Sequence, residues 1–196
     1  MPEGGGDTAA RIVAAARSCL LADGYAALST RRVADGAGVP LSQIHYHFGG
    51  KRGMVLGVLE HENRRLVDRQ RRMYGADMPL SARYEQACDF LEEDLASGYV
   101  RVLQEMIAAG WSDDALSREV VSLLHAWFEV LQDVAREAET RFGSLGPFTP
   151  GDIAGLVGLS FLGGEAMILL GDEEWASRAR GWLRSVGGLI KELEQA

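Results

Sequence analysis

A short run of polar side chains between residues 41 and 51 carries the groups best suited to bind a partner molecule. It contributes hydroxyl, amide, imidazole, phenol and ammonium groups from Ser42, Gln43, His45, Tyr46, His47 and Lys51. An amide such as that of Gln43 can bond an adenine edge in bidentate fashion, and Leu41 can contact a thymine methyl. Phosphate oxygens accept hydrogen bonds from hydroxyl and cationic groups. The residues expected to donate such bonds are Thr30, Arg31, Tyr46, His47 and Lys51. These residue types predict contact with duplex DNA.

Short helices near the amino end would position these groups. The pattern predicts helices over about 8–24, 30–37 and 41–48, then a long helix over 51–73. Ser29 is a suitable N-cap for the second helix, and Pro40 is tolerated at the start of the third. Ile44 and Phe48, four residues apart, share one side of the third helix and would face a core. Two helices joined by a glycine-containing turn predict a helix-turn-helix.

Charge is distributed unevenly along the chain. The formal net charge is −8, yet residues 1–73 carry 11 Arg and Lys against 7 Asp and Glu. Residues 74–196 carry 9 Arg and Lys against 21 Asp and Glu. A basic amino-terminal part and an acidic remainder suit a protein of which only one end meets phosphates.

Composition favours a helical protein with a sizeable core. Apolar residues make up 47% and charged residues 24% of 196 residues, values typical of globular proteins. Ala, Leu, Arg and Glu dominate, so an all-α fold is expected. We expect a DNA-binding domain over 1–52, a connector helix over 51–73 and a ligand-binding and dimerisation domain over 74–196. Further helices are expected at about 80–96, 99–110, 113–142, 150–170 and 172–194.

Compartment and membrane association follow from two segments and the two cysteines. The first residues lack a basic segment followed by an apolar run, so a signal peptide is not expected. Residues 153–170 are apolar but include Glu165 and four glycines, so an interface helix is expected rather than a membrane span. Cys19 and Cys88 are expected to be core thiols. The protein is expected to be cytoplasmic.

The sequence lacks the residue spacings typical of catalytic and metal-binding sites. His45 and His47 are two residues apart on a helix and point in different directions, unlike a metal-binding pair four apart. Neither a Gly-x-Ser-x-Gly elbow nor a phosphate-binding glycine loop is present. We therefore expect no enzyme activity, and assign no catalytic residue, metal or cofactor.

The amino-terminal segment resembles the DNA-binding domain of the TetR family of transcriptional repressors over about residues 8–60. The family's elements stand here as Gly24-Tyr25, Thr30, Ala34–Val39, Tyr46–Phe48 and Lys51. The resemblance implies an all-helical homodimer with one helix-turn-helix per subunit. It also implies a variable carboxy-terminal domain that binds a small molecule and controls the spacing of the two DNA-binding domains, here called the two heads.

This sequence departs from the family pattern in two places. His45 stands where the family most often has a tyrosine that contacts the DNA backbone. Pro40 stands where a serine usually caps the third helix. Both changes fall on the helix expected to meet DNA, although an imidazole can still donate to a phosphate.

Aromatic, sulfur-containing and polar side chains in apolar helical patterns mark the expected ligand site. The candidates are Phe90, Leu103, Met106, Trp111, His125, Trp127, Phe128, Phe161 and Glu165. Such residues line apolar pockets, but at helical spacing they also form plain cores. His125 and Glu165 each interrupt an apolar stretch and need a partner if buried. For His125 a ligand and a core role are both open; for Glu165 a structural or interface partner is favoured.

The last two predicted helices combine apolar residues with many glycines. Gly155, Gly158, Gly163, Gly164, Gly181, Gly187 and Gly188 fall inside them. Each glycine costs about 1 kcal/mol of helix stability relative to alanine, which is explicable where backbones approach closely. Pairing of these helices with their copies would form a four-helix dimer interface. Packing within one subunit is the alternative.

Together these patterns predict a dimeric, ligand-responsive DNA-binding repressor, released from a palindromic operator by a small, largely apolar effector. The alternative is a small-molecule-binding helical protein of the same fold that does not bind DNA.

Overall fold

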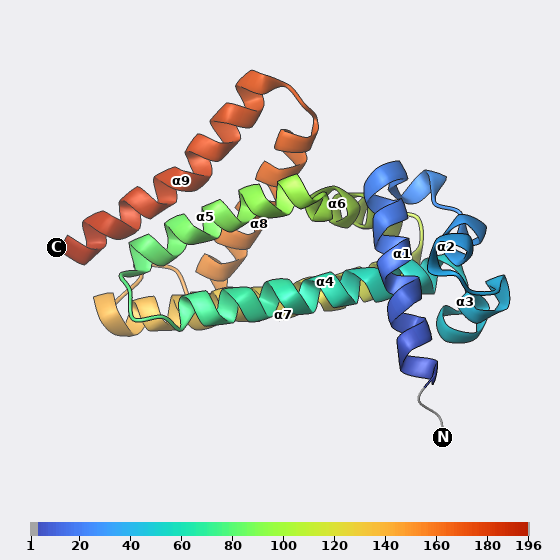
Figure 1. Cartoon of the computed structure of the whole chain (residues 1–196). Helices are drawn as coiled ribbons and strands as arrows, with labels where there is room; N and C mark the ends of the chain where they lie inside the picture. The colour runs from blue at the N-terminus through green and yellow to red at the C-terminus, as the bar shows by residue number, and fades with distance from the viewer. Residues whose placement is uncertain (1–3, 196) are drawn as a thin grey trace. The chain divides into compact units, whose positions relative to one another are not determined.

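The computed structural model describes residues 4–195, which form α-helices and no strands (Figure 1). The helices are α1 (Gly4–Ala27), α2 (Thr30–Ala37), α3 (Leu41–Phe48), α4 (Lys51–Tyr74), α5 (Leu80–Ser97), α6 (Tyr99–Gly110), α7 (Asp114–Phe142), α8 (Pro150–Leu169) and α9 (Glu173–Gln195). The expected all-α fold is confirmed, and most helix ends lie within two residues of their expected positions.

Local capping explains where two of the longer helices begin. Asp113 precedes α7, and its Oδ1 accepts the N–H groups of Ala115 and Leu116 at 3.0 Å each. Thr149 precedes α8 and forms a capping box with Asp152, in which each side chain accepts the other residue's backbone N–H. Such caps satisfy N–H groups that have no partner inside the helix.

The described chain divides into two compact units that do not coincide with the expected domains. The first takes in residues up to Arg65 together with Ser97–Leu123, and the second Leu66–Ala96 and Leu124 onward. Part of the segment assigned to the ligand domain therefore folds with the amino-terminal helices, because α6 packs on α1. The expected functional domains stay a prediction, since compactness alone assigns no role.

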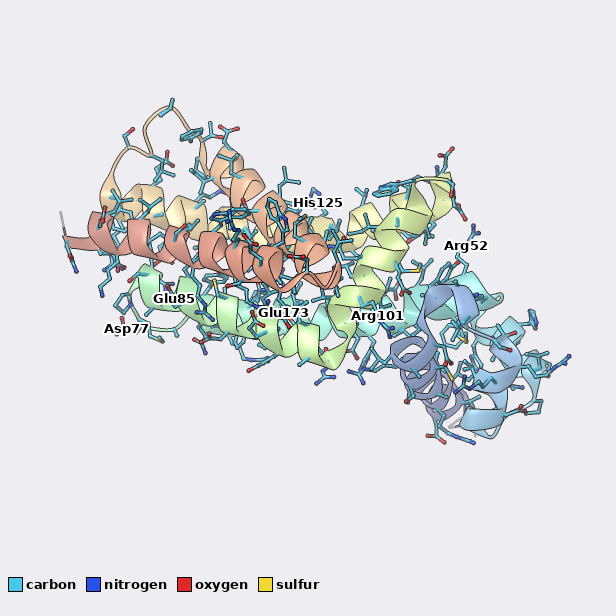
Figure 2. The ribbon with its side chains drawn as sticks, turned by 90° about the horizontal axis from the view of Figure 1, so that it is seen from above. Arg52, Asp77, Glu85, Arg101, His125 and Glu173 are labelled. Atoms are coloured by element: carbon cyan, nitrogen blue, oxygen red, sulfur yellow. The ribbon has the colours of Figure 1, made fainter. Side chains whose placement is uncertain are left out.

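In the first unit, α6 holds a break in α1. Gly24 has a φ of 76°, which interrupts the helical path and suits glycine because it lacks a Cβ. The carboxylate of Glu105 accepts the N–H of Tyr25 at 2.5 Å. Arg101, labelled in Figure 2, donates to the carbonyls of Leu20 and Leu21. Two α6 side chains thus satisfy backbone groups that the break leaves without helical partners.

The core of the first unit joins the amino-terminal helices to the start of α4. Ile12, Leu20, Ile44, Met54 and Leu59 are fully or almost fully buried. These residues come from α1, α3 and α4, so their burial fixes the small helices against the longer ones. Sequence periodicity predicted the inward position of Ile44.

The second unit is a helical bundle in which ion pairs connect α9 to α5. Arg180 pairs with Glu92 at 2.7 Å, and Arg184 pairs with Glu85 at 2.9 Å and Asp89 at 2.7 Å. Glu85 is labelled in Figure 2. The pairs are partly exposed, so each contributes on the order of 0–1 kcal/mol, and they fix orientation more than stability.

An apolar surface runs along α8 and α9 in the second unit. Its exposed members, here called the α8–α9 face, are Leu156, Leu159, Leu170, Trp175, Trp182, Leu189 and Leu193. Within the described residues, α8 alone is long and apolar enough to be a candidate membrane span, and 22% of that stretch is buried. The expected interface helix is therefore not buried by its own chain.

Candidate functional site

Helices α2 and α3 form a helix-turn-helix whose turn is held from outside. Gly38 adopts a left-handed conformation with a φ of 63° and ends α2. Arg11 of α1 donates to the carbonyl oxygens of Ala37 at 2.5 Å and Gly38 at 3.1 Å. Because these carbonyls lie at the end of α2, the guanidinium fixes the angle at which α3 leaves the turn. Periodicity did not indicate this role for Arg11.

The two faces of α3 differ as expected. Ile44 is fully buried, whereas Ser42, His45 and Tyr46 are exposed, with 81% of Tyr46 accessible. Leu41, Gln43 and His47 are half-buried. The helix thus presents a continuous polar surface with an apolar anchor beneath it.

Two α4 glycines allow the carboxy end of α3 to lie against α4. A Cβ built on Gly53 would come within 2.0 Å of the carbonyl oxygen of Phe48, and one on Gly57 within 3.0 Å of the Phe48 ring. Any larger residue at position 53 would have to move the backbone. The close approach orients α3, and spacing gave no signal for it, because the expected glycine contacts were in the last two helices.

Lys51 has protein partners of its own in the first unit. Its Nζ donates to the carbonyl of Ala26 at 3.2 Å and lies 4.8 Å from the centroid of the Tyr25 ring. An ammonium has three N–H donors, so one bond to Ala26 leaves capacity for a further acceptor. Lys51 therefore ties the segment after the α1 break to the start of α4.

The remaining expected DNA contacts lie at the start of α2. Thr30 is half-buried and Arg31 is exposed. The neighbouring Arg32 pairs with Asp23, which raises the pKa of its guanidinium. Ser29 caps the helix by accepting the N–H of Arg32 at 3.5 Å, the role expected for it. Both arginines of α2 are exposed, and among the described residues Arg32 is the one held by an ion pair.

The nine residues expected to bind a ligand do not lie together. Leu103 and Met106 are buried in the first unit, and Trp111, also in that unit, is 83% exposed. In the second unit, Phe90 lies under the Arg69 guanidinium at 4.2 Å. His125 is exposed and lies 3.5 Å from Glu129.

Three of the nine form an aromatic cluster in the second unit. The Trp127 and Phe161 ring centroids are 6.3 Å apart and those of Trp127 and Phe128 are 5.3 Å apart, both edge to face. The Trp127 Nε1 donates to Gln70 Oε1 at 2.9 Å. Glu165, the ninth, is buried in the same unit. The cluster resembles a packed core, the alternative weighed from the sequence.

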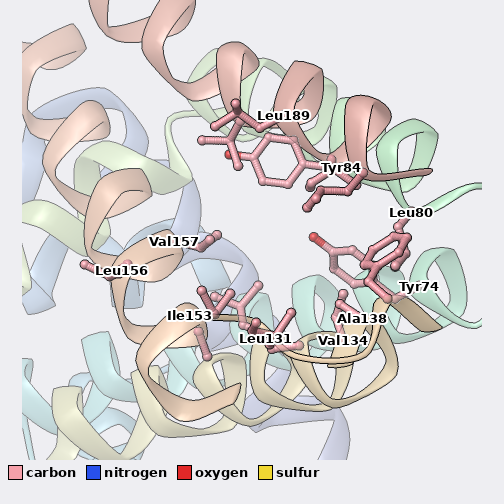
Figure 3. Close-up of a pocket in the computed structure, with 17 residues that line it drawn as sticks. Tyr74, Leu80, Tyr84, Leu131, Val134, Ala138, Ile153, Leu156, Val157 and Leu189 are labelled. Atoms are coloured by element: carbon pink, nitrogen blue, oxygen red, sulfur yellow. The ribbon is translucent and has the colours of Figure 1, made fainter. Parts of the chain in front are cut away.

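A cavity of about 240 Å³ opens in the second unit, and none of the nine expected ligand residues lines it (Figure 3). Aliphatic side chains such as Leu131, Val134, Ile153 and Val157 make up most of its wall. The expected residues are mainly aromatic, sulfur-containing or polar, whereas this wall is built mainly from Leu, Ile, Val and Ala. The ligand role of those nine stays a prediction.

Two tyrosines supply the polar groups of the cavity wall. Tyr74 is the last residue of α4, and Tyr84 lies in α5. Burial raises the pKa of both phenols, so both stay protonated at physiological pH. The Tyr74 carbonyl accepts a hydrogen bond from Arg83 Nη1, and Arg83 Nη2 pairs with Glu137 at 2.5 Å. These contacts fix the end of α4 at the cavity.

A shallower hollow of about 180 Å³ lies beside α7 and the start of α8. His125, Phe128, Glu129 and Gln132 line it together with small residues of α8. It brings together two of the nine expected residues, His125 and Phe128, in an open and more polar setting. Within residues 4–195, no three His, Cys, Asp or Glu side chains gather in a way that could hold a metal ion.

Comparison with known families identifies the family to which the amino-terminal domain belongs. Residues 12–58 match the family model for bacterial regulatory proteins of the tetR family. This segment covers most of α1, all of α2 and α3 and the first part of α4. The chain carries the amino-terminal domain of the TetR family of transcriptional regulators, and the resemblance drawn from the sequence is confirmed.

Solved structures extend the likeness in fold to the whole chain. A protein from Rhodococcus sp. described as a TetR-family transcriptional regulator superposes with a TM-score of 0.76 at 19% identity, covering 94% of this chain and 98% of its own. A TetR transcription regulator from Haloarcula marismortui gives a TM-score of 0.75 at 20% sequence identity, with 94% of this chain and 98% of that chain covered. A transcriptional regulator from Saccharomonospora viridis in complex with choline gives a TM-score of 0.74 at 17% identity, with 92% of this chain and 95% of that chain covered. Comparison with curated proteins finds no match.

Proposed function

We propose that this chain is a dimeric, ligand-responsive regulator of transcription that binds duplex DNA through α3. The observation that carries the proposal is the division of α3 into a buried Ile44 and an exposed surface bearing Ser42, His45 and Tyr46. A helix held this way can enter the major groove with its polar side chains toward base edges. Thr30, Arg31 and Lys51 would then contact phosphates.

The α8–α9 face supports a homodimer. Exposed Trp175, Trp182 and Leu189 follow one another at seven-residue intervals on α9, a spacing that suits packing against another helix. Helices α8 and α9 pack against each other, and exposed apolar side chains gathered on neighbouring helices mark interaction sites. Pairing around a two-fold axis would present two α3 helices to the two halves of a palindromic operator.

The second-unit cavity is proposed as the effector site, which makes the protein a repressor released by its ligand. Helix α4 begins at Lys51, directly after the α3–α4 connection, and its last residue, Tyr74, lines the cavity. An effector that binds better to an arrangement in which the two heads no longer fit the operator would shift the population to that arrangement. The shift cannot exceed the ligand's differential affinity for the two states.

Mobility-shift titration with the DNA upstream of the chain's own gene tests the proposal. We expect retardation that weakens as salt rises, because phosphate contacts release counterions. Gln43→Ala should cost about 1–3 kcal/mol at one base pair and relax preference there. Gln86→Ala, another half-buried glutamine, on α5, is the matched control. Retardation that is indifferent to DNA sequence would refute specific recognition.

A second candidate function is small-molecule binding in the same fold without DNA recognition. Two observations favour it: Pro40 provides no side-chain cap for α3, and the Lys51 ammonium is already engaged by Ala26 and Tyr25. The same titration separates the two, since this candidate requires ligand binding in a protein that retards no DNA.

A further inference from the structure

We propose that the second-unit cavity selects an uncharged, mostly hydrocarbon effector whose one hydrogen-bonding oxygen meets the hydroxyl of Tyr74. The inference rests on the proposed function, which makes the cavity the effector site. It adds the charge state of the effector and the group that anchors it.

The cavity wall contains no ionisable side chain that is charged at neutral pH. Its lining residues are aliphatic or aromatic, and their side-chain heteroatoms are the two tyrosine hydroxyls. Moving an isolated carboxylate or ammonium into such surroundings is costly unless it finds a partner. Arg83, behind Tyr74, is paired with Glu137 and so offers no free charge to a ligand. The wall therefore disfavours ionised acids and amines alike.

A cation held by aromatic faces is the strongest competing ligand class. Tyr74, Tyr84 and Phe142 line the cavity, and aromatic rings attract quaternary ammonium groups. Such binding is usually strengthened by a desolvated, electron-rich cage, whereas this wall is mainly Leu, Ile, Val and Ala. No carboxylate in the wall balances a positive charge, so the neutral ligand is favoured.

The hydroxyl of Tyr74 points into the cavity, and that of Tyr84 points toward the Leu189 side (Figure 3). No contact within the described part of the chain supplies either hydroxyl with a hydrogen-bond partner. Neither hydroxyl is among the fully buried side-chain atoms that lack a partner, so each keeps some accessible surface. A ligand that fills the cavity would bury the Tyr74 hydroxyl, and leaving it unpaired would then cost about 1–3 kcal/mol. An oxygen on the ligand avoids this cost, so a hydroxyl, carbonyl or ester is favoured over a pure hydrocarbon.

The size of the cavity sets the scale of the ligand. Its volume of about 240 Å³ exceeds that of an engineered apolar cavity of about 150 Å³ that accommodates benzene. A medium-length alkyl chain with one oxygen suits this space. Decanol is a suitable probe, with decanoate and decylamine as partners of equal chain length.

Calorimetric titration of the full-length protein without DNA tests the inference at neutral pH. We expect decanol to bind at least about tenfold more tightly than decanoate, decylamine or choline, a factor worth about 1.4 kcal/mol. Equal or tighter binding of decanoate or of either cation would overturn the neutral-ligand inference. Failure of the wild type to bind decanol at all would overturn it as well.

Tyr74→Phe tests the anchor. The substitution should weaken the affinity for decanol by about three- to tenfold, the effect of one hydrogen bond. It should leave the affinity for decyl chloride, which has no hydroxyl, unchanged. Tyr25→Phe, which removes the hydroxyl of a half-buried tyrosine of the first unit that does not line the cavity, is the matched control and should leave the affinity for decanol within about twofold of wild type. A Tyr74→Phe variant that binds decanol as wild type does would refute the anchoring role.

Filling the cavity tests its location. Ala138 lines the wall, so Ala138→Phe should abolish decanol binding, whereas Ala96→Phe on the exposed side of α5 should not. Leu156, Leu189 and Leu193 line the cavity and also belong to the α8–α9 face, so a second copy is the alternative occupant. Decanol binding that appears only when the dimer is broken by Trp182→Glu would show that the partner fills the cavity.

The two proposals fail separately. Ligand binding is measured without DNA. A protein that binds decanol but retards no DNA would therefore support the ligand inference and refute the proposed DNA-binding function. A protein that binds its operator but prefers decanoate would support the DNA-binding function and refute the ligand inference.

Discussion

Lys51 shows that a sequence can suggest a role for a side chain without revealing its contacts inside the chain. Its cationic group predicted a phosphate contact, which stays a prediction. The structure adds a hydrogen bond to Ala26 and a cation–π contact with Tyr25. Both partners lie some twenty-five residues earlier, and no local pattern connects them to Lys51.

Lys51→Ala should therefore lower both stability and DNA affinity. Loss of the Ala26 hydrogen bond and the Tyr25 contact should reduce the free energy of unfolding by about 1 kcal/mol. Affinity should fall for all DNA sequences, and the salt slope by about 1 if the ammonium also meets a phosphate. Lys191→Ala, at the exposed end of α9, is the control. Unchanged denaturation of Lys51→Ala would contradict the structural role.

Cys88 gives a pH-dependent prediction. Burial raises the pKa of its thiol to about 11, and the thiolate is the reactive form. In a Cys19→Ser background, alkylation of the folded protein should be slow at pH 8 and accelerate toward pH 11. Because the pKa is raised in the folded state, the associated stability is present below pH 9 and is lost as pH rises through about 11. Rapid alkylation at pH 7 would contradict this burial.

At the scale of the helices, the glycines of α8 and α9 fall into two groups. A Cβ on Gly158, Gly164 or Gly187 would meet side chains of the same chain at 3.0 Å or less. No described atom lies within 4 Å of a Cβ built on Gly155, Gly163, Gly181 or Gly188. Intrachain packing, one of the two alternatives left open by the sequence, therefore accounts for the first group, and dimer contact stays a prediction for the second.

A pair of alanine substitutions separates these groups. Gly158→Ala would place a methyl 2.4 Å from the Phe128 ring, and should destabilise the chain by about 1–3 kcal/mol. Gly155→Ala should gain up to about 1 kcal/mol of helix stability in the monomer. It should weaken the dimer if a partner backbone lies against position 155. Chemical denaturation and sedimentation measure the two effects, and an unaltered dimer would remove Gly155 from the interface.

Helix positions were predicted well because periodicity, caps and glycine stops are local signals. Ser29 caps α2 as expected, and Pro40 precedes α3. Arg11 and Gly53 were missed because their importance comes from residues on other helices, Ala37 and Phe48. A single sequence indicates which face of a helix is buried, but not what approaches it.

At the scale of the whole molecule, assembly is the property most open to test. Trp182→Glu places a charge in the middle of the α8–α9 face, where the native side chain is 55% exposed. We expect a folded monomer by sedimentation, with DNA affinity reduced to that of one head on one half-site. Trp111→Glu, at a more exposed tryptophan of the first unit, should leave the dimer intact. A Trp182→Glu protein that remains dimeric would place the interface elsewhere.

The cavity was less predictable from the sequence than the polar surface of α3. The α3 surface lies within eight consecutive residues, so the helical period alone decides what points outward. The cavity wall draws on α4, α5, α7, α8 and α9, and its location depends on how these helices pack. Aromatic composition pointed to residues such as Trp127 and Phe161, which lie in a packed cluster outside the cavity wall, and their ligand role stays a prediction.

The support that α6 gives to the break at Gly24 bears on engineering. A biosensor built by transplanting only residues 1–65 onto a foreign sensor would leave behind Arg101 and Glu105, and with them the acceptor for the Tyr25 N–H. Such a hybrid would have frayed amino-terminal helices whatever its new sensor detects. A successful graft has to include the segment 97–123 as well, which makes the exchangeable cassette discontinuous in sequence.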